Sequence, residues 1–183
     1  MISAKQVADV LTLSRLILAL TLAWLGYTQG AAVLPLACWL MIASWTTDVM
    51  DGWLAHRSRR QYSTWIGEHD LFFDISVSVG LFAYLLFSDL LPVWLGVVYI
   101  LFWVLIFWKF GFQFVLGMLF QAPIYGWFIC VALFQATNNG LLMLVWIVLA
   151  VLVTWPRFPQ QVVPGFLEKF KAVRGNDTLL GKK

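Results

Sequence analysis

Long apolar runs follow one another along this chain, separated by short polar or glycine-containing breaks. Six such runs can be drawn, with approximate limits of 11–28, 31–51, 70–89, 92–109, 112–136 and 140–155. Most of them reach the roughly 20 residues that a helix needs to span the hydrocarbon core of a bilayer. Their apolar positions are continuous rather than alternating, which favours helices over the strands of a barrel. The pattern predicts an all-α integral membrane protein built as a bundle of six transmembrane helices.

Composition agrees with this interpretation. The chain has 183 residues, of which 62% are hydrophobic and 11% are charged, and this excludes an ordinary soluble domain. A chain of this length is expected to form one domain. We therefore predict a transmembrane domain over residues 1–155 and a cytoplasmic tail over residues 156–183. Nothing in the composition indicates a nucleic-acid partner.

The basic residues predict the orientation in the membrane. In the six-span arrangement all twelve Lys and Arg residues fall on one face, which the positive-inside rule assigns to the cytoplasm. Both termini and the loop between the second and third apolar runs are then cytoplasmic, as expected for a protein of the plasma (inner) membrane. Arg15, near the start of the first run, is expected to snorkel to the interface.

Both ends of the chain have an amphipathic pattern. Residues 1–10 contain an apolar stripe beside Lys5, which predicts an N-terminal helix lying in the membrane interface. Residues 164–174 have one apolar helical face opposite several basic residues, which is typical of a helix on an anionic leaflet. A frayed polar tail is the alternative for this second segment.

Four acidic residues occur next to the polar loop that separates the second and third runs. Asp48 and Asp51 are three residues apart and Asp70 and Asp74 are four apart, so each pair shares a helical face. If the two helices are antiparallel neighbours, the four carboxylates lie at nearly one height, because four residues of helix advance by only about 6 Å. A charged residue at the bilayer centre costs roughly 2.5–3.5 kcal/mol, so these acids need compensation.

Divalent cations would supply that compensation. Four adjacent carboxylates cannot all remain ionised without opposite charge nearby, and two divalent ions would neutralise them. Hard oxygen ligands suit Mg²⁺ or Mn²⁺. Two such ions a few Å apart form a clamp for displacement at a phosphate. The alternative is that the acids are solvated at helix ends and pair with Arg57, Arg59 and Arg60.

The same residues resemble the signature of a known family, the CDP-alcohol phosphatidyltransferases. That signature is Asp-x-x-Asp-Gly-x-x-Ala-Arg, followed after a short interval by Gly-x-x-x-Asp-x-x-x-Asp. The segment Leu11–Arg15 also resembles the start of the first membrane helix in phosphatidylglycerophosphate-synthase-like members. The signature positions that this chain matches in order are Asp48, Asp51, Gly52, Ala55, Asp70 and Asp74.

The chain departs from the signature at three points. His56 stands where the pattern has Arg, and Arg57 follows one place late. Asp70 follows Asp51 by 19 residues, one more than in the pattern. Gly67 lies three residues before Asp70, one fewer than in the pattern. One residue turns a helix by about 100°, so Gly67 is not expected to present the same face as the family glycine.

The resemblance implies a reaction and a role for each matching residue. Asp48, Asp51, Asp70 and Asp74 would bind two Mg²⁺ or Mn²⁺ ions, and Asp74 would also be the general base. A phosphatidyl group would pass from CDP-diacylglycerol to a small polar alcohol, with release of CMP. The opening segment favours glycerol 3-phosphate as the acceptor over inositol phosphate and serine. The resemblance also implies a homodimer.

The remaining candidate residues surround the acids. Those expected at the nucleotide are Gly52, Ala55, His56, Arg57 and Gly67. Those expected at an acceptor phosphate are Arg59, Arg60 and Lys109.

Three other interpretations remain open at the level of sequence. One is the branch of the family that transfers a phosphorylated amino alcohol from a CDP carrier to diacylglycerol. Another is a family member that has lost catalysis. The third is a membrane protein that binds cations for transport, although Gln113, Gln121 and Tyr125 are few polar groups for an ion path.

Overall fold

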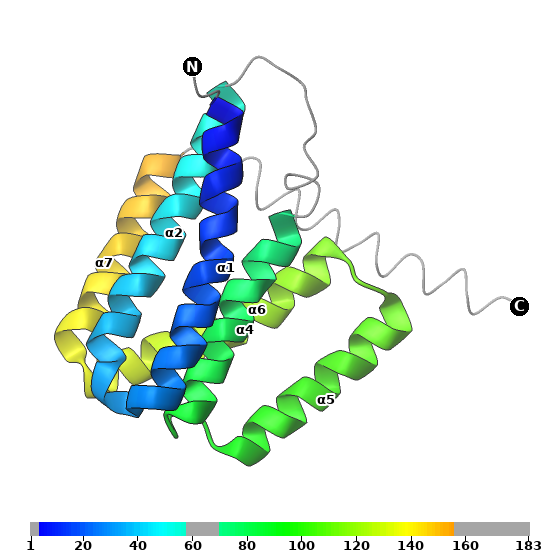
Figure 1. The fold of residues 1–183 in the computed structure, drawn as a ribbon, viewed down its shortest axis with the longest axis vertical. Helices are drawn as coiled ribbons and strands as arrows, with labels where there is room; N and C mark the ends of the chain where they lie inside the picture. Colours follow the sequence, from blue (N-terminus) through cyan, green and yellow to red (C-terminus); the bar gives the residue numbers. More distant parts are fainter. Residues whose placement is uncertain (1–3, 58–69, 156–183) are drawn as a thin grey trace, which may run out of the picture.

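The computed structural model describes residues 4–57 and 70–155, with the backbone alone described at residues 4–9, 11, 12, 51–57, 70, 71 and 74. The described residues form helices and turns and no strand (Figure 1). The helices are α1 (Ala4–Gln29), the short 3-10 helix η1 (Gly30–Val33), α2 (Leu34–Arg57), α4 (Asp70–Phe87), α5 (Val93–Phe110), α6 (Phe114–Gln135) and α7 (Thr137–Thr154).

Four segments of the described part are long and apolar enough to cross a membrane. They are Leu13–Met50, Val93–Phe110, Phe114–Gln135 and Thr137–Thr154. The first has 38 residues and contains parts of both α1 and α2, which turn back on each other at η1 (Figure 1). In α4 the apolar stretch Ile75–Phe87 is shorter than a span. The all-α integral membrane class is therefore confirmed, whereas six separate spans remain a prediction.

The turn between α1 and α2 is encoded by two residues. Gly30 has φ of 61°, a left-handed conformation that costs glycine little because it has no Cβ. Pro35 occupies the first turn of α2, where its missing N–H leaves no helical hydrogen bond unmade. These residues let the chain reverse within η1, and α2 then runs antiparallel to α1 (Figure 1).

Helix α1 is longer than a membrane requires. Its 26 residues correspond to about 39 Å of helix, against about 30 Å of hydrocarbon. Residues 4–10, predicted to form a separate interfacial helix, continue into the rest of α1 without a break in the helix. The prediction of a distinct N-terminal helix is therefore wrong over these residues. The second amphipathic segment, 164–174, lies outside the described residues.

Glycines allow α1 and α4 to pack closely. A Cβ added to Gly80 would lie 2.6 Å from the Cα of Ala19, and one added to Gly26 would lie 2.7 Å from the Cα of Tyr84. Small residues permit such close backbone approach between membrane helices, where dispersion contacts replace the hydrophobic effect as the driving force. The contact fixes the height of α4 relative to α1.

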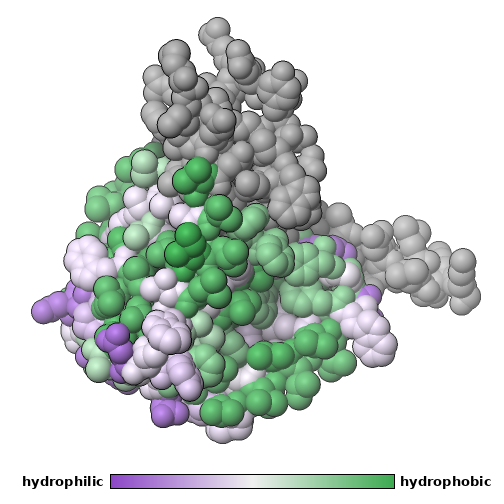
Figure 2. Space-filling model, in the orientation of Figure 1, coloured by the Kyte–Doolittle hydropathy of each residue, from purple (hydrophilic) through white to green (hydrophobic). Residues whose placement is uncertain are grey.

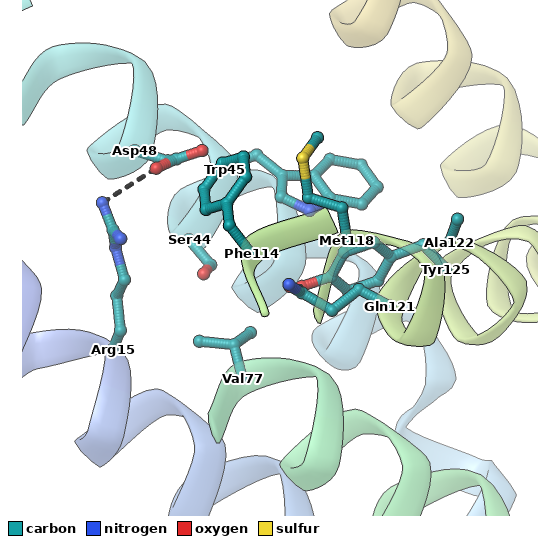
Figure 3. A pocket seen from close by; sticks show the side chains of 10 residues that line it. All are labelled: Arg15, Ser44, Trp45, Asp48, Val77, Phe114, Met118, Gln121, Ala122 and Tyr125. Atoms are coloured by element: carbon teal, nitrogen blue, oxygen red, sulfur yellow. Dashed lines mark hydrogen bonds and ion pairs between the residues drawn. The ribbon is translucent and has the colours of Figure 1, made fainter. Parts of the chain in front are cut away.

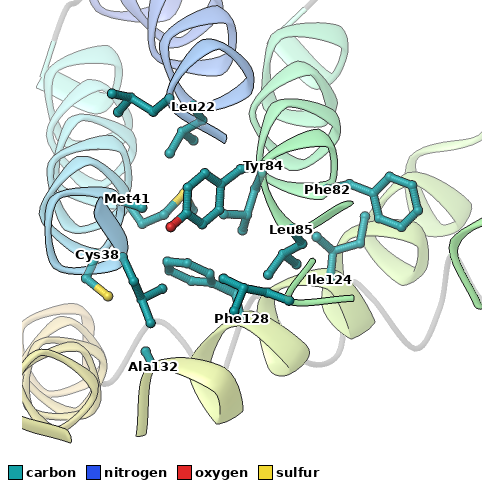
Figure 4. Close-up of a cluster of buried hydrophobic side chains, with 14 of the residues drawn as sticks. Leu22, Cys38, Met41, Phe82, Tyr84, Leu85, Ile124, Phe128 and Ala132 are labelled. Carbon is teal, nitrogen blue, oxygen red and sulfur yellow. The ribbon is translucent and has the colours of Figure 1, made fainter. Parts of the chain in front are cut away.

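The core lies where α1, α2, α4 and α6 meet, near the end of the bundle that contains η1. Tyr84 of α4 and Phe128 of α6 are both 0% exposed, with ring centroids 6.3 Å apart in an edge-to-face arrangement (Figure 4). Met41 of α2 and Leu22 of α1 are equally buried around them. This packing keeps the four helices together below the site described next.

Helix α5 stands away from the other helices in Figure 1. It contacts them mainly through aromatic side chains. The ring of Tyr99 packs against that of Phe82 in α4, and its hydroxyl donates a hydrogen bond to the carbonyl of Phe120 in α6. Most of its other large side chains are exposed. Apolar side chains cover much of the visible face of the described part, as expected for a surface in contact with lipid (Figure 2).

Candidate active site

A cavity of about 410 Å³ lies between four helices, α1, α2, α4 and α6. Figure 3 shows that the side chains of all four point toward it. Most of its lining is apolar or aromatic. The lining residues are Arg15 from α1; Ser44, Trp45 and Asp48 from α2; Val77 from α4; and Phe114, Met118, Gln121, Ala122 and Tyr125 from α6.

An ion pair joins two walls of this cavity. The Nη2 atom of Arg15 lies 3.0 Å from Oδ1 of Asp48 (Figure 3). The Arg15 side chain is 1% exposed and the Asp48 side chain is 58% exposed, so Asp48 lies at the rim. Arg15 precedes Gln29 by 14 residues and Asp48 follows Leu34 by 14 residues, which places both at the same height above the η1 turn.

This pair corrects the expectation for Arg15. We expected its side chain to snorkel to the interface, but it is buried and bound to one of the signature acids. A guanidinium in an apolar bundle requires an opposite charge, since its desolvation is otherwise uncompensated. The equal spacing of Arg15 and Asp48 from the turn is the signal in the sequence that could have revealed the pair.

The backbone places the other acids near the same end of the cavity. Asp51 lies one turn beyond Asp48 along α2, away from η1. Val77 lines the cavity, and Asp74 lies about one turn before it on α4, also away from η1. Asp70 lies one further turn along. By helical register, Asp51 and Asp74 therefore belong to the level just outside the Arg15–Asp48 pair.

The sequence predicts that the two helices bearing the acids, α2 and α4, are direct neighbours, and the structure shows, in the part it describes, that they are not. Over the described residues α1 packs extensively against both α2 and α4, which do not pack extensively against each other. Instead α2 and α4 both line the cavity, with α1 and α6 forming its other walls (Figure 3). The acids would then meet across an open space.

Asp48 contributes hard carboxylate oxygens at the exposed rim, which are suitable ligands for Mg²⁺ or Mn²⁺. Among the residues with described side chains, no three His, Cys, Asp or Glu groups come together. Asp51, Asp70 and Asp74 are described by backbone only. The four-carboxylate metal site therefore stays a prediction that agrees with the helical register.

The predicted nucleotide-binding residues follow Asp51 along the chain. Gly52, Ala55, His56 and Arg57 form the last turns of α2, where only the backbone is described. Gly67 lies outside the described residues. Their roles remain predictions that rest on the resemblance.

Of the residues predicted to bind an acceptor phosphate, only Lys109 is described. Arg59 and Arg60 lie outside the described residues. Lys109 is in the last turn of α5, a favourable place for a cation because of the helix dipole. Its Nζ lies 5.0 Å from the centroid of the Phe110 ring, and it does not line the cavity.

Polar groups occupy the part of the cavity lined by α6. The hydroxyl of Tyr125 donates to Oε1 of Gln121 over 3.1 Å, and Nε2 of Gln121 donates to the carbonyl of Gly117 over 3.3 Å. The ring of Trp45 contacts that of Tyr125 edge to face, with centroids 5.9 Å apart. The sequence alone relates Gln121 and Tyr125 only to a possible ion path. Their one-turn spacing was visible in the sequence, but the cavity that they face was not.

The family model described as CDP-alcohol phosphatidyltransferase matches residues 5–156. Neither the curated proteins nor the solved structures that were compared contain a match to this chain. The family match covers most of the chain and includes the ion pair, the four acids and every helix that lines the cavity. The chain belongs to the CDP-alcohol phosphatidyltransferase family.

Proposed function

We propose that this protein transfers a phosphatidyl group from CDP-diacylglycerol to a small hydroxyl acceptor and releases CMP. The observation that supports this most directly is the position of Asp48. This signature acid lies at the rim of a cavity, held by Arg15, and the helical register brings Asp51 and Asp74 to the adjacent level. A lipid donor also explains why such a site belongs to a membrane bundle, since the acyl chains remain in the bilayer.

In the proposed reaction Asp74 is the general base. It accepts the proton of the acceptor hydroxyl, whose oxygen forms a bond to the phosphorus attached to diacylglycerol. The bond from that phosphorus to the bridging oxygen breaks, and CMP departs with the oxygen and its electron pair. Asp48, Asp51, Asp70 and Asp74 would hold two Mg²⁺ or Mn²⁺ ions, which when bound neutralise charge on the pyrophosphate.

Other residues have proposed roles in binding. Gly52, Ala55, His56, Arg57 and Gly67 are the candidates at the nucleotide. Arg59, Arg60 and Lys109 are the candidates for an acceptor phosphate. Leu11–Arg15 favours glycerol 3-phosphate as the acceptor on the basis of sequence alone.

We further propose how the molecule sits in the membrane. Each of the helices α1, α2, α4, α5, α6 and α7 has 18 residues or more, and each would cross the bilayer once. The basic residues would put both termini and the active site on the cytoplasmic side of the inner membrane. Two copies would associate as a homodimer.

The test is an assay of CMP release by the purified full chain in bilayer nanodiscs. The mixture contains CDP-diacylglycerol, Mg²⁺ or Mn²⁺ and a panel of alcohols. We expect CMP to be released only when the metal is present. Asp74→Asn should lower the rate by about a hundredfold or more, since general-base catalysis contributes about 10²–10⁴-fold.

Asp89→Asn is the matched control. Asp89 is exposed in the turn after α4, near the η1 end of the bundle, and its φ of 56° is tolerated by asparagine. This variant should keep the activity of the original chain. Release that persists in EDTA, or in Asp74→Asn, would contradict the mechanism.

Two observations keep an inactive member of the family as the second candidate. His56 replaces the signature Arg, and Gly67 is displaced by one residue. Strong Mn²⁺ binding without turnover on any acceptor would favour that candidate or the cation-binding protein. Turnover with a CDP-linked amino alcohol and diacylglycerol would favour the other branch of the family.

A further inference from the structure

The charge balance of the cavity restricts which acceptor it suits. Its described lining contains one cation, Arg15, and one anion, Asp48, and the two are paired over 3.0 Å. An acceptor that carries a phosphate monoester would bring about two negative charges into this space. Recognition of such a group normally uses free Arg or Lys donors. The described lining offers no cation beyond the one engaged by Asp48.

The described part of the chain, residues 4–57 and 70–155, supplies few other cations near this space. Residues 70–154 form α4 and α6, which line the cavity, together with α5 and α7, and they contain a single basic residue, Lys109. Lys109 lies beside the Phe110 ring and outside the lining. Arg57 is nine residues beyond Asp48 along α2, which corresponds to about 13 Å along the helix axis in the direction away from η1.

The polar groups that do line the cavity suit uncharged partners. Gln121 is 9% exposed and Ser44 is 4% exposed, and both are in the apolar part of a membrane protein. Polar side chains in such surroundings are costly and commonly mark a substrate site. Gln121 has amide donor and acceptor atoms, and Tyr125, hydrogen-bonded to it, adds a hydroxyl. Hydroxyl and amino groups are the natural partners of this set.

The position of these groups also agrees with the proposed chemistry. Val77 lines the cavity, and Asp74 lies about one turn beyond it on α4, toward the end where Asp48 forms the rim. An acceptor that places its reacting hydroxyl at the level of Asp74 would extend its other groups toward Gln121 and Tyr125. The aromatic surfaces of Trp45 and Tyr125 would then cover its carbon skeleton (Figure 3).

We infer that the acceptor of this enzyme is a small alcohol without a phosphate group, bound in the cavity by the Gln121–Tyr125 pair. The inference rests on the proposed transferase function. It departs from the preference for glycerol 3-phosphate that the opening segment Leu11–Arg15 gave, and it removes the acceptor-phosphate role proposed above for Arg59, Arg60 and Lys109.

The experiment compares acceptors in matched pairs. The purified full chain in nanodiscs receives CDP-diacylglycerol and Mn²⁺, together with glycerol or glycerol 3-phosphate, or with inositol or inositol 1-phosphate, because both members of each pair keep a free hydroxyl. Both CMP and the lipid product are measured. We expect the unphosphorylated member of the best pair to have a kcat/KM at least about tenfold higher, since a buried phosphate without cationic partners is penalised.

Variants then test the cavity itself. Gln121→Leu should raise the KM for the preferred acceptor by about tenfold, the effect of one lost hydrogen bond, and leave the KM for CDP-diacylglycerol unchanged. Gln113→Leu is the matched control, because Gln113 immediately precedes α6, bonds the carbonyl of Phe110 over 2.9 Å and does not line the cavity. Tyr125→Phe gives a second measurement if Gln121→Leu does not fold.

The outcomes are distinct. Preference for the phosphorylated members would overturn the inference and leave the transferase function intact. An acceptor KM that is equal in Gln121→Leu, Tyr125→Phe and the original chain would overturn the role of the cavity. Absence of CMP release with every acceptor would instead contradict the proposed function, and the inference with it.

Discussion

At the residue scale, the two side chains of the ion pair differ in burial: Arg15 is 1% exposed and Asp48 is 58% exposed. Asp48→Asn leaves a buried guanidinium without its carboxylate, whereas Arg15→Met leaves a carboxylate that water can reach. We expect Asp48→Asn to destabilise the fold by about 3 kcal/mol, at the low end of the range for broken buried pairs because Asp48 is exposed. Arg15→Met should cost clearly less. Thermal unfolding in detergent with EDTA measures both.

The double variant provides the control for this pair. Arg15→Met combined with Asp48→Asn should be more stable than Asp48→Asn alone, because the double variant has no buried guanidinium that lacks its carboxylate. Equal destabilisation by the two single variants would show that the pair does not have the asymmetry that burial predicts. Chelation by EDTA keeps metal binding at Asp48 from contributing to the comparison.

At the scale of helices, the contact between α1 and α4 determines how Arg15 and Asp74 are placed relative to each other. Gly80→Ala adds a Cβ that would meet the backbone of Ala19, and backbone cannot rotate away as a side chain can. Such overpacking typically costs about 1–3 kcal/mol. We expect a lower unfolding temperature together with lower CMP release, since α4 must move away from α1.

Gly126 provides a matched substitution on α6. A Cβ at Gly126 meets nothing within 4 Å, so Gly126→Ala should be neutral or stabilising by up to about 1 kcal/mol from helix propensity. If Gly126→Ala and Gly80→Ala had the same effect on the unfolding temperature, close packing at Gly80 would not be the cause.

The helices also show where prediction from sequence stops. Runs such as 92–109 and 112–136 predicted α5 and α6 to within a few residues, because hydropathy is a local property. The same patterns did not reveal that α1 packs against both α2 and α4. Packing depends on which faces meet, and nearly uniform apolar helices give little indication of their inward face. The continuity of α1 through residues 4–10 was missed because amphipathicity in one segment does not define a helix boundary.

At the scale of the whole molecule, the testable feature is orientation. Asn138 is exposed at the start of α7 and Phe112 is exposed in the turn between α5 and α6, at opposite ends of α6. In a Cys130→Ala background, with Cys38 buried, Asn138→Cys should react with a membrane-impermeant maleimide in intact cells. Phe112→Cys should react only after the membrane is permeabilised. The reverse pattern would contradict the positive-inside assignment.

The sequence by itself determined the membrane class, the family and the spacing of the acids on their helices, because hydropathy, motif order and helical period are properties of neighbouring residues. Only the tertiary structure decided that Arg15 binds Asp48 and that Gln121 and Tyr125 face the same cavity. The ion pair joins residues 33 positions apart in the chain, and the cavity brings α6 together with α1, α2 and α4. They depend on the close approach of α1 to α4 and on the turn at η1, which orient one face of each helix toward a shared space.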